Sequence, residues 1–509
     1  MTDLLIRIAE ELKSSLAFLG RALLPAWLLP VRDRDSHGGS GWAKRADGRR
    51  LGRLTSPEKP AGDGIVLGWL GRRLLQSPAE DNVLILGVQR SGKTSTVAVP
   101  TLLTWQGPVV ATSTKEELVR LTSAARRRRG PIWVFAPLDR DQSWMEPLGL
   151  QAATWNPVDE ALDCGAAAEL ADYFTAEGKR GPSTHWYLSA ANLLTGLLAF
   201  AREREGDMRT VLITLNRTAQ AEYLQLAGVV ADQTAADLLH AFSMTPDREA
   251  GSIASTARSC LSLWIDERVA LATSSGGNQI DLDQLLADAG TLYLVAPAEE
   301  AERCRPLFSA LIASLLRRAT TRARGQGGAL SPRLLVALDE AANFARIPRL
   351  AGYASSGPGQ GIQLLLCYHD LAQIEGAYGF EEARTIWNNC RARLLLPGQG
   401  DLKTLEHFSR AIGDETRFYD SAHHSRRETS SSEQRTGRPL ITVDELRRLD
   451  QAVLLYANVP PARLSLRRWD QVPAWRALVQ SFPPGPAAPV FPPAGAAPPL
   501  IRRKAKELR

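Results

Sequence analysis

The stretch that decides the fold of this chain is Gly87-Val88-Gln89-Arg90-Ser91-Gly92-Lys93-Thr94. It matches the pattern GxxxxGK(S/T) in full. It lies between an apolar run at 83–86, which predicts a buried strand, and a segment that predicts a helix from Lys93 onwards. In this order of strand, loop and helix, backbone N–H groups and the positive end of the helix surround a phosphate group. The stretch therefore predicts a nucleotide-binding P-loop within an α/β domain.

Each residue type in this loop has a chemical reason. Glycines let the backbone N–H groups approach the β-phosphate without a Cβ in the way. The ammonium of Lys93 reaches the β- and γ-phosphates, and the hydroxyl of Thr94 is a ligand for Mg²⁺. We expect the nucleotide to be ATP. The residues expected to contact it are Gly87, Gln89, Arg90, Ser91, Gly92, Lys93, Thr94 and Ser95.

The second half of such a site is a buried strand that ends in acidic residues. The apolar run 334–338 is followed directly by Asp339 and Glu340. We expect Asp339 to hold Mg²⁺ through a water molecule, and Glu340 to orient or deprotonate the attacking water. Together with Lys93, this pair predicts hydrolysis of a nucleoside triphosphate, with most of the catalysis coming from charge stabilisation and positioning.

The pattern around these motifs predicts one α/β domain that is interrupted by a helical one. Apolar runs predict strands at 83–86, 108–112, 132–135, 291–295, 334–338, 362–366, 392–396 and 452–456. Strands that alternate with helices are typical of a mainly parallel sheet with helices on both faces. An Ala/Leu-rich stretch lies between the third and fourth runs. The predicted units are a nucleotide-binding domain at 32–158 and 280–475, an all-α domain at 159–279, and terminal segments at 1–31 and 476–509.

The two ends of the chain differ from its middle. Apolar residues at 8, 12, 16, 19 and 23 share one face of a predicted helix, but Pro25 and Pro30 leave this stretch too short to span a bilayer as a regular helix. Residues 3–30 are expected to lie on a membrane, to dock on a partner helix, or to pack on their own domain. The Pro/Ala-rich stretch 483–499 and the basic cluster 501–506 predict a disordered tail, with an acidic partner as the alternative.

Composition excludes several classes of protein. The chain has 509 residues, of which 44% are hydrophobic and 23% charged. It can therefore bury a large core, and it is neither disordered throughout nor a polytopic membrane protein. Its five cysteines form no CxxC pair, which argues against a zinc site or a disulfide framework and favours a reducing compartment.

The net charge of +6 is ambiguous, because a solvated surface explains it as well as an anionic partner does. The densest run is four arginines at 126–129. We expect this run to be a solvated helix end, with contact to nucleic-acid phosphates as the alternative. The polar stretch 418–438 predicts a mobile loop that faces solvent, a pore or an interface. Since the sequence has no base-reading signature, any DNA binding is expected to be sequence-tolerant.

The motifs together resemble a known family, the type IV secretion coupling ATPases that serve conjugative DNA transfer. The matching stretches, in chain order, are 42–43, 65–68, 99–105, 113–115, 155–157, 338–343, 370–374, 377–379 and 438–446. They keep the order of the family and extend over most of the chain, from about residue 39 to 469.

The resemblance implies a RecA-like motor domain that carries an all-α domain. It further implies a ring of six subunits, with ATP and Mg²⁺ at the interfaces and DNA through the centre. Proteins of this kind recruit a relaxase–DNA complex, or a protein substrate, and deliver it to a type IV secretion channel. From the sequence we expect a cytoplasmic location, with a peripheral contact at the inner face of the cell membrane through residues 3–30 as the alternative.

The sequence departs from the family in three places. The family usually begins with a membrane-spanning segment, whereas this chain has only the short amphipathic stretch. The family commonly has Gln at the end of the strand after the acidic pair, whereas this chain has His369. Neutral His can still donate one hydrogen bond to a γ-phosphate or to water, so His369 is a candidate catalytic residue, and an ordinary strand-end residue is the alternative.

The third departure concerns the arginine that several relatives direct at the ATP of a neighbouring subunit. The stretch 355–361, just before the strand that leads to His369, contains no arginine. The candidates to replace it are Arg346, Arg349, Arg391 and Arg393. Such an arginine is worth about 10³-fold or more in rate, so without one hydrolysis is expected to be slow.

The sequence leaves two alternatives to a DNA-transfer motor. One is a nucleotide-dependent adaptor that hydrolyses ATP weakly and gathers substrates for a separate motor. The other is a double-stranded DNA pump of the septal type, which shares the motor fold but fits the all-α insertion and the 370–374 stretch less well.

Overall fold

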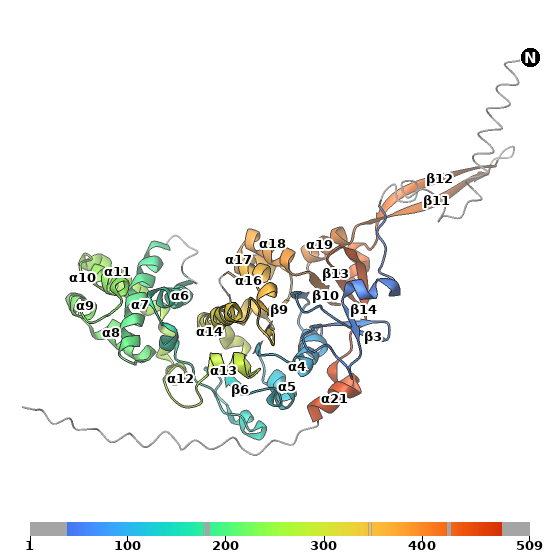
Figure 1. Cartoon of the computed structure of the whole chain (residues 1–509). Helices are drawn as coiled ribbons and strands as arrows, with labels where there is room; N and C mark the ends of the chain where they lie inside the picture. The colour runs from blue at the N-terminus through green and yellow to red at the C-terminus, as the bar shows by residue number, and fades with distance from the viewer. Residues whose placement is uncertain are drawn as a thin grey trace, which may run out of the picture.

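The computed structural model describes residues 38–480, except 177, 179–183, 345, 348 and 425–428. A nine-stranded sheet runs through its centre in the order β14-β13-β10-β4-β9-β8-β5-β7-β6 (Figure 1). The strands from β10 to β6 are parallel, whereas β13 and β14 are antiparallel to their neighbours. The strands are β4 (Val83–Leu86), β5 (Val109–Ser113), β6 (Ile132–Phe135), β7 (Thr291–Val295), β8 (Leu334–Leu338), β9 (Ile362–Tyr368), β10 (Ala392–Leu395), β13 (Ala452–Tyr456) and β14 (Val459–Leu464).

This architecture confirms the predicted α/β fold with its mainly parallel sheet. Every predicted strand is present within two residues of its expected bounds, and β14 is an addition. The strands β4, β5, β7, β8 and β9 are buried at every position, which is why they read as continuous apolar runs. In β4, Leu84 and Leu86 belong to one core cluster, whereas Val83 and Ile85 belong to a second cluster on the opposite face.

Helices cover both faces of the sheet, as predicted. On the face of Leu84 lie α14 (Ala298–Gly325), α17 (Leu371–Tyr378) and α18 (Phe380–Asn389). On the face of Val83 lie α4 (Val99–Thr104), α5 (Glu117–Arg127) and α21 (Pro473–Gln480). The other helices outside the stretch between β6 and β7 are α3 (Gly48–Leu51), α15 (Ala341–Phe344), α16 (Leu350–Ser356), α19 (Leu402–Ile412) and α20 (Val443–Arg447).

Between β6 and β7, the described residues form helices, apart from short turns and two isolated bridges at the edges of this stretch. They are α6 (Cys164–Thr175), α7 (Thr184–Glu203), α8 (Met208–Arg217), α9 (Tyr223–Ala227), α10 (Gln233–Ser243), α11 (Asp247–Cys260), α12 (Glu267–Ala272) and α13 (Leu282–Ala287). In Figure 1, α7 to α11 form a bundle beside the sheet. This content agrees with the all-α stretch expected at 159–279, while the domain bounds themselves stay a prediction.

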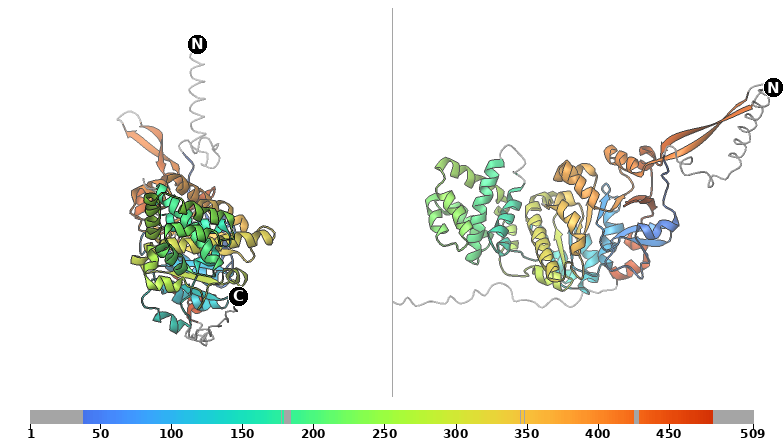
Figure 2. Two further views of the ribbon diagram at one scale, coloured as in Figure 1. Left: turned by 90° about the vertical axis from the view of Figure 1, so that its left-hand side faces the viewer. Right: turned by 45° about the horizontal axis from the view of Figure 1, so that its top comes forward.

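The mobile loop predicted at 418–438 is wrong. Residues 418–424 and 429–438 belong to an antiparallel ribbon of β11 (Asp414–His424) and β12 (Thr429–Pro439) that projects from the body of the molecule (Figure 2). Its two strands pair from Asp414 opposite Pro439 to His424 opposite Thr429, which hydrogen-bonds the backbone groups that face each other. Its base is held by the start of the described chain, since Thr416 N–H donates to Gly38 O at 3.0 Å and Ser40 N–H donates to Asp414 O at 3.0 Å.

A second, three-stranded sheet lies beside β14. It consists of β1 (Arg53–Thr55), β3 (Arg73–Gln76) and β2 (Val66–Leu70), in that order. Backbone hydrogen bonds between Trp69 and Ser465 join it to the chain after β14.

The arginine run at 126–129 is only partly the solvated helix end that its sequence predicts. Arg126 is 1% exposed. Its guanidinium donates to Thr291 Oγ1 at 2.8 Å, to Gly107 O at 2.6 Å and to Trp105 O. Burial lowers its pKa to about 10. Arg126 therefore holds α5 against the start of β7, and only the later arginines of the run are exposed.

The predictions for the termini largely fall outside the described residues, namely the amphipathic segment at 3–30 and the basic tail at 501–506. The boundary predicted between 475 and 476 lies inside α21, which extends to Gln480. Within the described part of the chain, we find no helix of sufficient length and apolarity to cross a membrane.

Candidate functional site

The glycine-rich loop leaves β4 at the centre of the sheet, between the ends of β10 and β9. Gly87 N–H donates to Tyr368 O at 3.0 Å, at the end of β9. A Cβ at Gly87 would lie 2.5 Å from Ser91 Oγ and 3.0 Å from Leu396 Cβ, so this position requires glycine. Gly92 has a φ of +94°, and a helix begins at Lys93 as predicted, with a wide π-helical turn that continues into α4. Strand, loop and helix therefore have the arrangement of a phosphate-binding loop.

The ammonium of Lys93 lies inside this loop. The residue is 6% exposed, and its Nζ donates to Gly87 O at 2.6 Å and to Val88 O at 3.1 Å. An ammonium has three donors and is easily redirected. Lys93 is thus positioned to exchange the loop's own carbonyl oxygens for phosphate oxygens.

The acidic residue after β8 meets the loop directly. Thr94 Oγ1 donates a hydrogen bond to Asp339 Oδ2, and Thr112 Oγ1 donates to the backbone oxygen of Asp339 at 2.9 Å. Asp339 is 9% exposed, and burial raises the pKa of its carboxyl. Its second oxygen, Oδ1, has no hydrogen-bond partner among the described residues. A hydroxyl and a carboxylate with a spare oxygen are the hard ligands that Mg²⁺ prefers, so these residues fit a Mg²⁺ site.

Glu340 follows at a sharp turn of the backbone, with a φ of +52°. A left-handed conformation is uncommon for a residue other than glycine, and it tends to persist where surrounding structure demands it, often at functional sites. The turn places Glu340 directly beside the Thr94–Asp339 pair, where the sequence predicts a residue that acts on water.

His369 stands at the end of β9, one residue after the partner of Gly87. Its N–H donates to Gln373 Oε1 at 2.8 Å, and its carbonyl accepts from Gln399 Nε2 at 2.7 Å. The side-chain Nε2 is buried and has no hydrogen-bond partner among the described residues. Burial and the positive charge of Lys93 lower the pKa of His369 below its ordinary value, so the imidazole is neutral at pH 7.

The structure thus brings the four predicted catalytic residues, Lys93, Asp339, Glu340 and His369, to one edge of the sheet. The remaining loop residues line its surface: Gln89 and Arg90 are exposed, Ser91 Oγ is a buried atom without a partner among the described residues, and Ser95 Oγ donates to Gly92 O at 3.4 Å. Sequence reasoning missed Gln399, whose hydrogen-bond partner lies 30 positions earlier. No spacing pattern could have indicated it.

The four candidate arginines have different surroundings. Arg391 forms an ion pair with Asp81 at 3.3 Å, near the opposite edge of the sheet. Arg393 lies over the ring of Trp387, and an Nη of Arg346 donates to Gly376 O at 3.4 Å. Arg349 precedes α16 and is 83% exposed. Of the four, Arg349 presents the most exposed guanidinium to a neighbouring molecule.

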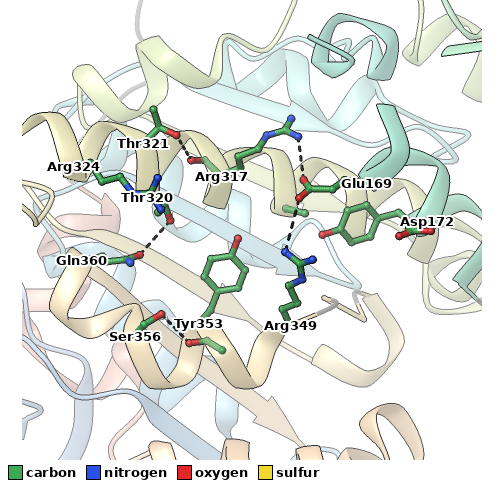
Figure 3. A pocket seen from close by; sticks show the side chains of 13 residues that line it. Glu169, Asp172, Arg317, Thr320, Thr321, Arg324, Arg349, Tyr353, Ser356 and Gln360 are labelled. Carbon is green, nitrogen blue, oxygen red and sulfur yellow. Dashed lines mark hydrogen bonds and ion pairs between the residues drawn. The ribbon is translucent and has the colours of Figure 1, made fainter. Parts of the chain in front are cut away.

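Arg349 also borders a cavity of about 400 Å³ between α6, α14 and α16 (Figure 3). The guanidinium groups of Arg317 and Arg349 point to the carboxylate of Glu169, with N–O distances of 3.1 Å and 3.9 Å, and Tyr353 of α16 lines the cavity. The cavity is separate from the phosphate loop. The lining has the three arginines 317, 324 and 349 against the two acidic residues Glu169 and Asp172, so the cavity is only weakly basic.

Comparison with known proteins gives the family. The family described as "Type IV secretory system Conjugative DNA transfer" matches residues 44–471. The conjugal transfer protein TraG of Escherichia coli is 28% identical over 466 residues, which cover 81% of this chain and 71% of TraG. The protein VirD4 of Rhizobium rhizogenes is 24% identical over 468 residues, which cover 88% of this chain and 67% of VirD4.

Solved structures give the fold. The plasmid coupling protein TrwB in complex with the ATP analogue ADPNP superposes with a TM-score of 0.61 at 18% identity, over 84% of this chain and 93% of that protein. TrwB in complex with ADP and Mg²⁺ gives a TM-score of 0.60 at 19% identity, over 84% and 94%. The extent of the family match and the conjugal-transfer relatives show that this chain belongs to the conjugative DNA transfer family of type IV secretion, the coupling proteins with a P-loop nucleotide-binding fold.

Proposed function

We propose that this chain is an ATP-hydrolysing motor that drives DNA, delivered as a relaxase–DNA complex, or a protein substrate into a type IV secretion channel. The observation that carries the proposal is the contact between Thr94 and Asp339, which lie 245 positions apart in the chain. A P-loop hydroxyl that meets a buried carboxylate is the arrangement that phosphoryl transfer needs.

In the proposed reaction, Lys93 turns from the loop carbonyls to the β- and γ-phosphates of ATP. Thr94 would hold Mg²⁺ through its hydroxyl, and Asp339 would hold it through a water molecule. The metal, when bound, neutralises phosphate charge. Glu340 orients the attacking water and accepts its proton. The neutral imidazole of His369, with its proton on Nε2, donates a hydrogen bond to the γ-phosphate or to the water.

We further propose that six copies form a ring around DNA, with the nucleotide at the subunit interfaces. Arg349 is our candidate for the arginine that reaches a neighbour's ATP, because it is the most exposed of the four. DNA contacts are to phosphates and are therefore sensitive to salt. The division into a motor domain at 32–158 and 280–475 and an all-α domain at 159–279 is part of this proposal, as are a cytoplasmic location and a peripheral membrane contact through residues 3–30.

A weakly hydrolysing adaptor is the second candidate. Two features favour it: His369 in place of the family's Gln, and the absence of arginine from 355–361. The septal-type pump is less well supported, because the relatives reported above are conjugal transfer proteins.

ATP turnover with and without single-stranded DNA tests the proposal. We expect wild-type turnover to rise with DNA, and Lys93→Ala and Glu340→Gln each to lower it by about 10² or more. Tight ATP binding with negligible turnover would favour the adaptor. Turnover that is the same in wild type and Lys93→Ala, with and without DNA, would overturn the motor.

A further inference from the structure

Gln399 connects the two loops that flank the phosphate-loop strand. It belongs to the segment after β10, whereas its bonding partner His369 follows β9, and β4 lies between these two strands. Gln399 is 3% exposed, and both polar atoms of its side-chain amide have hydrogen-bond partners. Its amide therefore forms a strap across the end of β4, where the phosphate loop begins.

The strap is fixed at both ends. Gln399 Nε2 donates to His369 O at 2.7 Å, while Gln399 Oε1 accepts from the N–H groups of Gly400 at 2.9 Å and Asp401 at 3.0 Å. A second bond ties the same two segments, since Leu371 N–H donates to Thr404 Oγ1 at 3.1 Å. The strap's segment also approaches the phosphate loop, because a Cβ at Gly398 would lie 3.7 Å from Val88 Cγ2.

These bonds restrain the backbone of His369 from two sides. Gln373 accepts its N–H at 2.8 Å, and Gln399 donates to its carbonyl. The side chain, in contrast, ends in the buried Nε2 that lacks a partner among the described residues. A buried polar atom without a partner is costly, so a group held in this way beside a phosphate loop is prepared for a ligand atom.

We propose that Gln399 is a positioning residue of the nucleotide site, which holds the His369 backbone so that the imidazole meets the γ-phosphate. The proposal rests on the proposed nucleotide function and names a residue that acts through His369. A side chain that acts in this way adds to the discrimination between nucleoside triphosphate and diphosphate, because only the triphosphate carries the group that His369 contacts.

The variant Gln399→Met tests this, because methionine keeps the length and volume but cannot make the three hydrogen bonds. The chain offers a matched control in Gln363, at the other end of β9. Gln363 is fully buried, and its Nε2 donates to Ser77 Oγ at 3.0 Å, to Pro78 O at 3.1 Å and to Asp81 O at 2.8 Å. Gln363→Met removes a comparable buried amide far from His369.

The experiment measures the affinities of ADPNP and ADP, each with Mg²⁺, by displacement of a fluorescent ADP. We expect wild type to prefer ADPNP, and Gln399→Met to reduce this preference about 3- to 10-fold, the size of one lost hydrogen bond. His369→Ala should reduce it similarly, and the double variant should resemble His369→Ala alone. Gln363→Met should lower the unfolding temperature and leave the preference unchanged.

Three results would overturn the proposal: an unchanged preference in Gln399→Met, fully additive effects in the double variant, or an equal loss in Gln363→Met. The preference for ADPNP is measured at equilibrium and does not depend on hydrolysis. A protein that binds ADPNP but never hydrolyses ATP would therefore refute the motor, while the role of Gln399 could still be tested. A wild type that binds neither nucleotide would overturn both proposals.

Discussion

Thr94 Oγ1 donates a hydrogen bond to Asp339 Oδ2, which joins the first turn after the phosphate loop to the end of β8. The carboxyl of Asp339 is buried, and its Oδ1 is left without a partner among the described residues. A carboxylate in this position is unfavourable for the folded chain on its own and favourable once Mg²⁺ is near. Part of the stability of the fold is therefore given up for the site.

The first prediction concerns this carboxyl. Burial raises its pKa above the ordinary 3.8, so the unfolded chain ionises it at lower pH than the folded chain does. Stability is consequently lost as pH rises from about 3.8 to the folded pKa. Asp339→Asn should remove this loss and raise the free energy of unfolding at pH 7 in the absence of Mg²⁺. Calorimetry or denaturant unfolding measures it.

Asp81→Asn provides the contrast for that experiment. Asp81 is also buried, but it pairs with Arg391 and accepts a hydrogen bond from Tyr456, so its substitution should lower the stability. Asp339→Asn should also abolish the stabilisation that Mg²⁺ and ADPNP confer together. An Asp339→Asn protein that is less stable than wild type at pH 7 would contradict the prediction.

The second prediction concerns His369. Its pKa is lowered by burial and by Lys93, so the wild-type rate should be level above pH 6.5 and fall only at lower pH, as the imidazole takes up a proton. His369→Gln supplies a permanently neutral amide, and we expect it to raise turnover about 3-fold or more and to remove the acid fall. A pH series of the steady-state rate measures both effects.

His407→Gln is the matched control for His369→Gln. His407 is half-buried, its pKa is also lowered by burial, and its ring meets Trp387 at 4.6 Å, away from the phosphate loop. Its substitution should change neither the rate nor the pH profile. A lower rate in His369→Gln than in wild type would show that the imidazole serves this chain better than the family's amide.

The third prediction concerns Arg349. If it acts on a neighbour's ATP, Arg349→Ala should lower turnover by about 10³-fold with little change in unfolding temperature, because its ion pair with Glu169 is long and exposed. Arg324→Ala, at the same cavity, is the control. Subunits with Arg349→Ala mixed with subunits with Glu340→Gln should recover part of the activity, since some interfaces then carry both groups intact. If the mixture recovers no activity, or if Arg349→Ala alone keeps the wild-type rate, Arg349 does not act on a neighbour's ATP.

The fourth prediction separates the arginines of the 126–129 run. Arg126→Met should lower the free energy of unfolding by about 3 kcal/mol, because it leaves several buried carbonyls without their donor. It should not reduce DNA affinity at a temperature where the variant is folded. Arg129→Ala, in contrast, should reduce DNA affinity and have little effect on the free energy of unfolding. Chemical denaturation and a DNA-binding titration at two salt concentrations distinguish the two, and equal stability of both variants would refute the buried role.

The sheet and the site were predictable for the same physical reason. Parallel strands that are buried on both faces appear as unbroken apolar runs, and Asp339 follows such a run directly. The loop glycines and Lys93 follow a second such run, β4. Because the strands are parallel, the phosphate loop after β4 and the acidic residue after β8 lie at the same edge of the sheet.

Other features depend on contacts that no local pattern records. Arg126 looks like part of a solvated run, because the carbonyls it meets come from residues 105, 107 and 289. The polar sequence of the ribbon predicts a loop, because its two strands pair mainly with each other and have no apolar run. Gln399 belongs to the same class, since its role is visible only once β9 and β10 are placed on either side of β4.

The ribbon of β11 and β12 has a mechanical consequence. The chain runs from Gln399 straight into α19, and at the end of α19 a bond from Ser409 Oγ to Ile441 O, with Leu440 N–H to Gly413 O, ties the helix to the ribbon's base. Each strand has 11 residues, a length of about 35 Å at 3.3 Å per residue. Because the ribbon is attached to the rest of the molecule at α19, a tilt of about 5° at this attachment would move its far end by about 3 Å. A displacement of this size is large enough to make or break a hydrogen bond.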